Sequence, residues 1–113
     1  MQVIIASEYG DILIELVENP ATRQFVAMLP LELEWRDFAG KEKITYLPSK
    51  LQVTKDSSYI PQVGDFFCYV PWGNIGIFYK QQPAGDLAYL GKVISGLEFL
   101  QKQDFKAKVY LKQ

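Results

Sequence analysis

The sequence is dominated by short runs in which apolar and polar residues alternate with a period of two. Residues 31–36 place leucine and tryptophan on one face and glutamate and arginine on the other, and residues 105–112 alternate apolar residues with lysine or tyrosine. Because this period brings every second side chain to the same face of a strand, one face is buried and the other solvated. The pattern favours a mainly β fold.

Turn-forming residues separate eight such runs. Tyr9-Gly10 joins the first two runs as a hairpin, and the segments 71–74 and 83–86 mark further turns. Residues 48–63 are expected to be mostly irregular. The expected strands cover residues 3–5, 11–17, 31–36, 42–47, 66–70, 75–80, 87–94 and 105–112.

Two short helices are expected among these strands. Asn19 precedes a proline and supplies a helix N-cap, and Pro30 prevents continuation, which predicts a helix over residues 20–29. Residues 96–103 favour a second short amphipathic helix. Eight strands and two helices predict a closed or nearly closed β-barrel whose ends the helices cover.

The composition limits the domain organisation and the partners. A chain of 113 residues, 49% of them hydrophobic, predicts a single domain over residues 1–113. The formal net charge is −1, from 12 basic and 13 acidic residues. We therefore expect no nucleic-acid partner and no anionic membrane surface. No apolar run approaches the 18 residues of a membrane span, and the N-terminal apolar run is too short for a signal peptide, so the cytoplasm is expected.

The residue inventory also limits the chemistry. The sequence has no histidine, which removes Ser-His-Asp and Cys-His nucleophile systems and the commonest transition-metal ligand. Its single cysteine, Cys68, rules out an intramolecular disulfide framework. Apolar and aromatic neighbours predict that Cys68 is a buried, inert thiol. We expect no metal, no cofactor and no catalytic residue.

Two segments resemble cyclophilins. The first is Ile-Glu-Leu at 14–16 followed by Asn-Pro-Ala-Thr-Arg-Gln-Phe at 19–25, which is similar to the strand that leads into the proline-started helix of cyclophilins. The second and more specific match is Leu-Gly-Lys-Val-Ile-Ser-Gly-Leu-Glu at 90–98. It resembles the late cyclophilin strand, Phe-Gly-Lys-Val-x-x-Gly-Met, which runs into the second helix.

The resemblance extends over the whole chain. Gly-Asp at 64–65, Pro-Trp-Gly-Asn at 71–74 and Phe-Tyr at 78–79 add to it, and the chain is similar to a small prokaryotic family with a cyclophilin-like fold. This resemblance implies a closed eight-stranded β-barrel capped by two short helices, in agreement with the strand pattern. It does not imply the enzyme activity.

The residues that serve cyclophilin peptidyl-prolyl isomerases are mostly missing. Where their arginine is expected, the segment 46–51 offers only Lys50, which lacks a guanidinium fork. The Phe-Met-Gln group has no counterpart, and the loop that carries Trp and His in cyclophilins is reduced to residues 81–86. Only Phe78 or Ile77 could serve as the floor of a proline pocket.

The best candidate binding residues lie in the turn 71–74. Trp72 and Asn74 offer a stacking surface and a hydrogen-bonding group at a barrel rim. Tyr46, Phe78 and Lys50 complete the candidate ligand-binding set. The alternative is an ordinary turn whose tryptophan covers the barrel end, with the strand aromatics in the core.

Three carboxylates, Glu42, Asp65 and Asp86, lie beside turns. Each could serve acid/base chemistry, but turn residues that bond the nearby backbone are the simpler interpretation for Asp65 and Asp86. The lysines at 106, 108 and 112 indicate a solvated face that discourages pairing between molecules.

Three functions are compatible with these features. The first is a non-enzymatic binding module in which the cleft corresponding to the proline pocket holds a peptide segment or a small molecule. The second is a weak peptidyl-prolyl cis-trans isomerase whose activity is very low or absent. The third is an accessory subunit of an amide-cleaving enzyme complex. The sequence leaves the ligand, the physiological role and the oligomeric state open.

Overall fold

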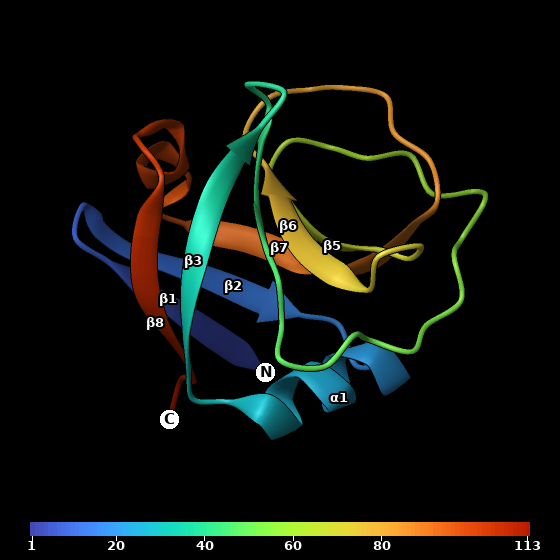
Figure 1. Cartoon of the computed structure of the whole chain (residues 1–113), viewed down its shortest axis with the longest axis horizontal. Coiled ribbons are helices and arrows are strands. Elements are labelled where there is room, and N and C mark those ends of the chain that lie inside the picture. Colours follow the sequence, from blue (N-terminus) through green and yellow to red (C-terminus); the bar gives the residue numbers. More distant parts are fainter.

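Eight antiparallel strands close into a barrel in the order β1-β2-β7-β5-β6-β4-β3-β8 (Figure 1). The computed structural model describes residues 1–113. The strands are β1 (Gln2–Ser7), β2 (Gly10–Leu16), β3 (Leu31–Phe38), β4 (Glu42–Thr45), β5 (Asp65–Tyr69), β6 (Asn74–Phe78), β7 (Leu87–Ser95) and β8 (Phe105–Leu111). The closed mainly β barrel predicted from the sequence is confirmed.

Helix α1 (Pro20–Met28) begins as its sequence predicts. Asn19 accepts a hydrogen bond from the backbone N–H of Thr22, and the Thr22 hydroxyl accepts one from the backbone N–H of Asn19, which forms a capping box. The helix ends one residue earlier than expected, with Leu29 as its C-cap in extended backbone.

The second helical segment differs from the expectation. It is a 3-10 helix, η1 (Leu97–Gln101), and not an amphipathic helix over 96–103. The chain is already extended at Lys102 and enters β8 at Phe105, which leaves room for little more than one turn. The segment still serves as a cap, because Leu100 is fully buried in the core. Figure 1 shows α1 and η1 on opposite sides of the barrel.

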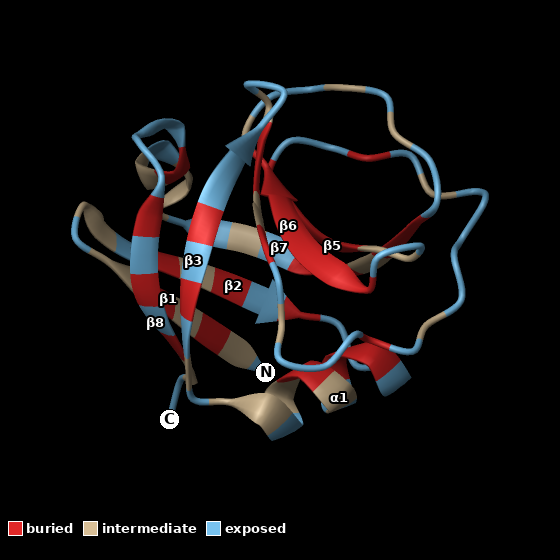
Figure 2. Cartoon of the chain, viewed as in Figure 1, coloured by how far each residue is buried: buried red, intermediate tan, exposed pale blue.

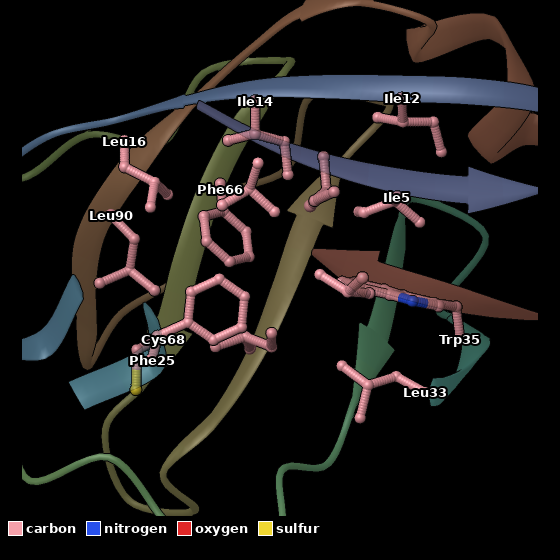
Figure 3. Close-up of a cluster of buried hydrophobic side chains, with 14 of the residues drawn as sticks. Ile5, Ile12, Ile14, Leu16, Phe25, Leu33, Trp35, Phe66, Cys68 and Leu90 are labelled. Carbon is pink, nitrogen blue, oxygen red and sulfur yellow. The ribbon is translucent and has the colours of Figure 1, made fainter. Parts of the chain in front are cut away.

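The barrel interior is filled by side chains from all parts of the chain (Figure 3). Phe25 of α1 and Phe66 of β5 lie in contact, with ring centroids 5.5 Å apart. Trp35 of β3 is completely buried. Cys68 is buried, as predicted, and burial raises the pKa of its thiol to about 11. Its inertness toward thiol reagents stays a prediction.

Burial differs between the two sides of the barrel (Figure 2). Strand β8 alternates between buried and exposed residues along most of its length, and the lysines at 106, 108 and 112 are exposed as expected. Strand β6 is buried at every residue. Its outer face is therefore covered as well as its inner one, and the covering segments are the long connections 46–64 and 79–86.

Two strand boundaries near this covered face differ from the predicted ones. Strand β4 ends at Thr45, two residues early, and β6 runs over Asn74–Phe78 and not over 75–80. Asn74 is therefore the first residue of a strand and not part of the turn. The register places Ile77 in the barrel core and Phe78 on the outer face. None of the helical segments has the length and apolar character needed to cross a membrane.

Candidate functional site

A second, smaller hydrophobic cluster lies on the outer face of the barrel. It consists of Phe67 of β5, Phe78 of β6 and Leu87 of β7, all at most 3% exposed. The two phenylalanine rings stack with centroids 4.4 Å apart and an interplanar angle of 23°. Aromatic residues normally pack inside a barrel, so an outer cluster requires a cover of its own.

Gly76 lets the Phe67 ring lie flat on the sheet. A Cβ at Gly76 would lie 2.6 Å from Cζ of Phe67 and 3.1 Å from Cγ2 of Ile44. Contacts of 2.6 Å are too short for carbon atoms, so only glycine leaves space for the ring in this position. The close approach of Phe67 to β6 therefore shapes the outer face.

A cavity of about 450 Å³ lies over this outer face. Its floor contains Ile44, Phe67, Phe78 and Leu87, and one wall is the loop 82–86. Its volume falls in the usual range for small-molecule sites, roughly 300 to 1,000 Å³. The remaining lining residues are Phe38, Glu42, Tyr69, Trp72 and Asn74.

Asn74 lines the cavity and carries an unpaired, buried hydrogen-bond acceptor. The residue is 2% exposed, and its side-chain oxygen Oδ1 has no hydrogen-bond partner. A buried polar atom without a partner costs about 1 to 3 kcal/mol, and such atoms are uncommon in folded proteins. A ligand with an N–H or O–H donor would supply the missing partner.

Glu42 places a carboxyl group at the edge of the same cavity. The residue is 7% exposed, and its Oε2 accepts a 2.5 Å hydrogen bond from Nε2 of Gln82. Burial raises the pKa of Glu42 to about 7; the Gln82 hydrogen bond opposes this shift and the negative charge of Asp37 adds to it. The carboxyl group therefore changes its charge near neutral pH.

Trp72 also lines a second cavity on this side, so that the cavity over Phe67 and Phe78 is the larger of the two and the second is the smaller. The residue is 44% exposed; its indole stacks on Tyr46 with ring centroids 6.4 Å apart and meets the Tyr69 ring edge-on, with centroids 5.0 Å apart. The smaller cavity, of about 220 Å³, is lined by Tyr46, Lys50, Trp72 and Asn74 among others. Trp72 and Asn74 thus line both cavities.

The five candidate residues fall into two neighbouring places. Phe78 lies on the floor of the larger cavity, and Tyr46 and Lys50 lie only in the smaller one. Two further residues of the larger cavity, Phe67 and Gln82, are not among the candidates predicted from the sequence. For Gln82, the only available signal was its place in a loop that cyclophilins use.

The other two carboxylates, Asp65 and Asp86, are held by contacts within the fold. Asp65 is buried and accepts hydrogen bonds from the Tyr59 hydroxyl at 2.5 Å and the backbone N–H of Gln62 at 2.8 Å, which fixes the long connection 46–64. Asp86 has a positive φ of 62° and pairs with Lys55 at 2.9 Å. The structure has no cluster of three or more Cys, Asp or Glu side chains that could hold a metal ion.

The fold is a closed, eight-stranded antiparallel barrel. A model of the Cyclophilin-like family matches residues 5–112, and the chain therefore belongs to this family. Among solved structures, it is similar to the solution structure of the hypothetical protein AF2241 from Archaeoglobus fulgidus, with a TM-score of 0.78 and 17% sequence identity. That match covers 97% of this chain and 93% of the other and shows a shared fold. No curated protein matches the sequence.

Proposed function

We propose that the protein is a non-enzymatic binding module whose larger cavity holds a small molecule or a segment of a peptide. The observation that carries this proposal is the unpartnered Oδ1 of Asn74, 2% exposed, beside an apolar floor. A ligand that combines an apolar group with a hydrogen-bond donor fits both features.

The energetics of the cavity support binding. The exposed rings of Phe38 and Trp72 in the lining give a ligand apolar area to bury, at roughly 25 cal/mol per Å². A donor directed at Asn74 would remove the cost of its unpaired oxygen, about 1 to 3 kcal/mol. Trp72 adds a large, half-exposed contact surface at the rim. Tryptophan residues of this kind often carry a large part of a binding energy.

The same residues offer little for catalysis. Glu42 has no nucleophile among its hydrogen-bond partners, and its one partner is the neutral amide of Gln82. The cavity lining contains no arginine or lysine that could stabilise a developing negative charge. These features favour recognition over chemistry.

A fragment screen by amide-detected NMR tests the proposal. Fragments that combine a ring with a donor are expected to shift the amide signals of Ile44, Phe78 and Leu87. The substitution Asn74→Ala is expected to weaken these fragments about tenfold, because the substituted protein no longer offers the acceptor. Lys108→Ala, on the exposed face of β8, is the control and is expected to leave binding unchanged. An absence of hits, or hits confined to other faces, would contradict the proposal.

A further inference from the structure

The charged residues that line the larger cavity are both acidic. Two carboxylates, Glu42 and Asp86, line it, and neither lysine nor arginine does. Lys50, the cation among the candidate binding residues, lies in the smaller cavity. The lining residues would therefore repel an anionic ligand and attract a cation.

Of the two carboxylates in the lining, only Glu42 has no cationic partner. Asp86 already pairs with Lys55 at 2.9 Å, while Glu42 forms no salt bridge. Only Oε2 of Glu42 accepts a hydrogen bond, from the neutral Gln82 amide, so Oε1 is available to a further donor. A mostly buried carboxylate without a positive partner is costly, and a cationic ligand would offset that cost.

The walls between the polar groups are aromatic. Five of the fourteen lining residues carry aromatic rings: Phe38, Phe67, Tyr69, Trp72 and Phe78. The faces of such rings attract cations, and they also bury apolar groups. An acidic group among several rings is a typical arrangement for an ammonium ion attached to an apolar body.

The two acceptors lie at opposite ends of the floor. Glu42 pairs with Phe78 across the β4–β6 ladder, and Asn74 lies four residues before Phe78 on β6. A strand rises about 3.3 Å per residue, which separates these two positions by roughly 13 Å. A ligand that binds Glu42 through a cation can therefore extend its apolar part along the floor toward Asn74.

We propose that the ligand of the larger cavity is an organic ammonium ion with an apolar body, whose cationic group binds Oε1 of Glu42. This inference rests on the proposed binding function and adds the chemical class of the ligand. An ammonium group supplies a donor for Oε1 of Glu42, and the apolar body packs against the exposed lining rings of Phe38 and Trp72.

Binding of an ammonium ion should depend on pH through Glu42. The charge that acts on it is that of Asp37 on β3; the other titratable groups of the lining, Tyr69 on β5 and Asp86 in the wall loop, lie toward the Asn74 end, and Asp86 is paired to Lys55. Burial raises the pKa of Glu42 to about 7, so the carboxylate that the cation needs forms as the pH rises through this value. Affinity should increase between pH 5.5 and 8.5, where an alkylammonium stays charged.

Three matched probes test the inference. They are 2-phenylethylammonium, its neutral analogue 2-phenylethanol, and the anion phenylacetate, each titrated at pH 8 while the amide signals of Ile44 and Phe78 are followed. The ammonium ion should bind at least tenfold more tightly than the alcohol, and phenylacetate should not bind. Equal or tighter binding of the alcohol or the anion would overturn the inference and leave the proposed function standing. If the three probes fail while the fragment screen succeeds, only the inference falls; if both fail, so does the proposed function.

The variant Glu42→Gln removes the negative charge of this side chain and nearly keeps its size. It should lower the affinity for 2-phenylethylammonium about tenfold at pH 8 and remove its pH dependence, while the affinity for 2-phenylethanol stays unchanged. Glu98→Gln, an exposed position on η1, is the matched control and should behave like the native protein. An unchanged ammonium affinity in Glu42→Gln, with native amide signals outside the cavity, would overturn the inference.

Discussion

Gln82 donates a 2.5 Å hydrogen bond from Nε2 to Oε2 of Glu42, across 40 residues of sequence. This contact joins the loop 79–86 to the first residue of β4 at the edge of the larger cavity. Because the partner is neutral, the hydrogen bond only partly offsets burial, and the pKa of Glu42 stays near 7. The charge of Glu42, and with it the charge of the cavity lining, therefore changes close to physiological pH.

The titration of Glu42 should make the folded protein less stable as the pH rises. Its folded pKa of about 7 exceeds the ordinary value of 4.5, so the folded state binds this proton more tightly than the unfolded state does. The resulting stabilisation is present in full below about pH 4.5 and is lost as the pH rises through 7. Denaturant unfolding of the native protein and of Glu42→Gln should therefore differ in its pH dependence, by about 2 to 3 kcal/mol between pH 4.5 and 8.5. Parallel stability curves for the two proteins would contradict this assignment.

The substitution Gly76→Ala should disturb the cavity floor. The new Cβ would lie 2.6 Å from the Phe67 ring and 3.1 Å from the backbone oxygen of Lys43, so the ring must move. We expect a loss of about 1 to 3 kcal/mol in the free energy of unfolding, measured by denaturant titration. Gly85→Ala is the control, because a Cβ there meets nothing within 4 Å. Equal stability of the two variants would show that the floor is not tightly packed.

The two tryptophans should respond differently to replacement by alanine. Trp35 is fully buried in the barrel, and Trp35→Ala should cost about 3 to 5 kcal/mol of stability. Trp72 is 44% exposed at the cavity rim, so Trp72→Ala should cost less than about 2 kcal/mol and weaken ligand binding about tenfold or more. Melting temperatures and ligand titrations check both effects. If Trp72→Ala lowers the melting temperature as much as Trp35→Ala and retains binding, Trp72 serves to cover the core and is not a binding residue.

Peptidyl-prolyl isomerase activity should be absent or very low. The chain has two arginines; Arg36 pairs with Glu34 at 2.9 Å on an exposed face and Arg23 lies exposed on α1, so neither lines the cavity. The loss of one electrostatic donor commonly lowers a rate about 10²- to 10³-fold. NMR exchange measurements on a prolyl peptide at high protein concentration check this. Catalysis near cyclophilin efficiency would contradict the binding-module proposal.

The sequence predicted the barrel better than the cavity. Alternation located β3 and β8 because each has one buried and one solvated face, and Asn19 with its proline located the start of α1. The run that forms β5 is different, since both of its faces are buried and no alternation shows that Phe67 points outward.

The polar part of the cavity depends on distant contacts. Glu42 and Gln82 meet only because the loop after β6 folds back over β4, and no local pattern joins residues so far apart. Asn74 was identified for its residue type and its place beside a turn, but its burial and its unpaired oxygen follow from the covering segments. Phe78 could be separated from Ile77 only by the strand register.

The most direct test of the central claim is to locate a bound ligand relative to the aromatic floor. Intermolecular nuclear Overhauser effects should connect the ring protons of a bound 2-phenylethylammonium ion, or of any hit from the fragment screen, to those of Phe67, Phe78 and Trp72. Such contacts are predicted because these rings line the larger cavity. Contacts confined to Tyr110, beside the lysines of β8, would contradict the claim that the outer-wall cavity is the binding site.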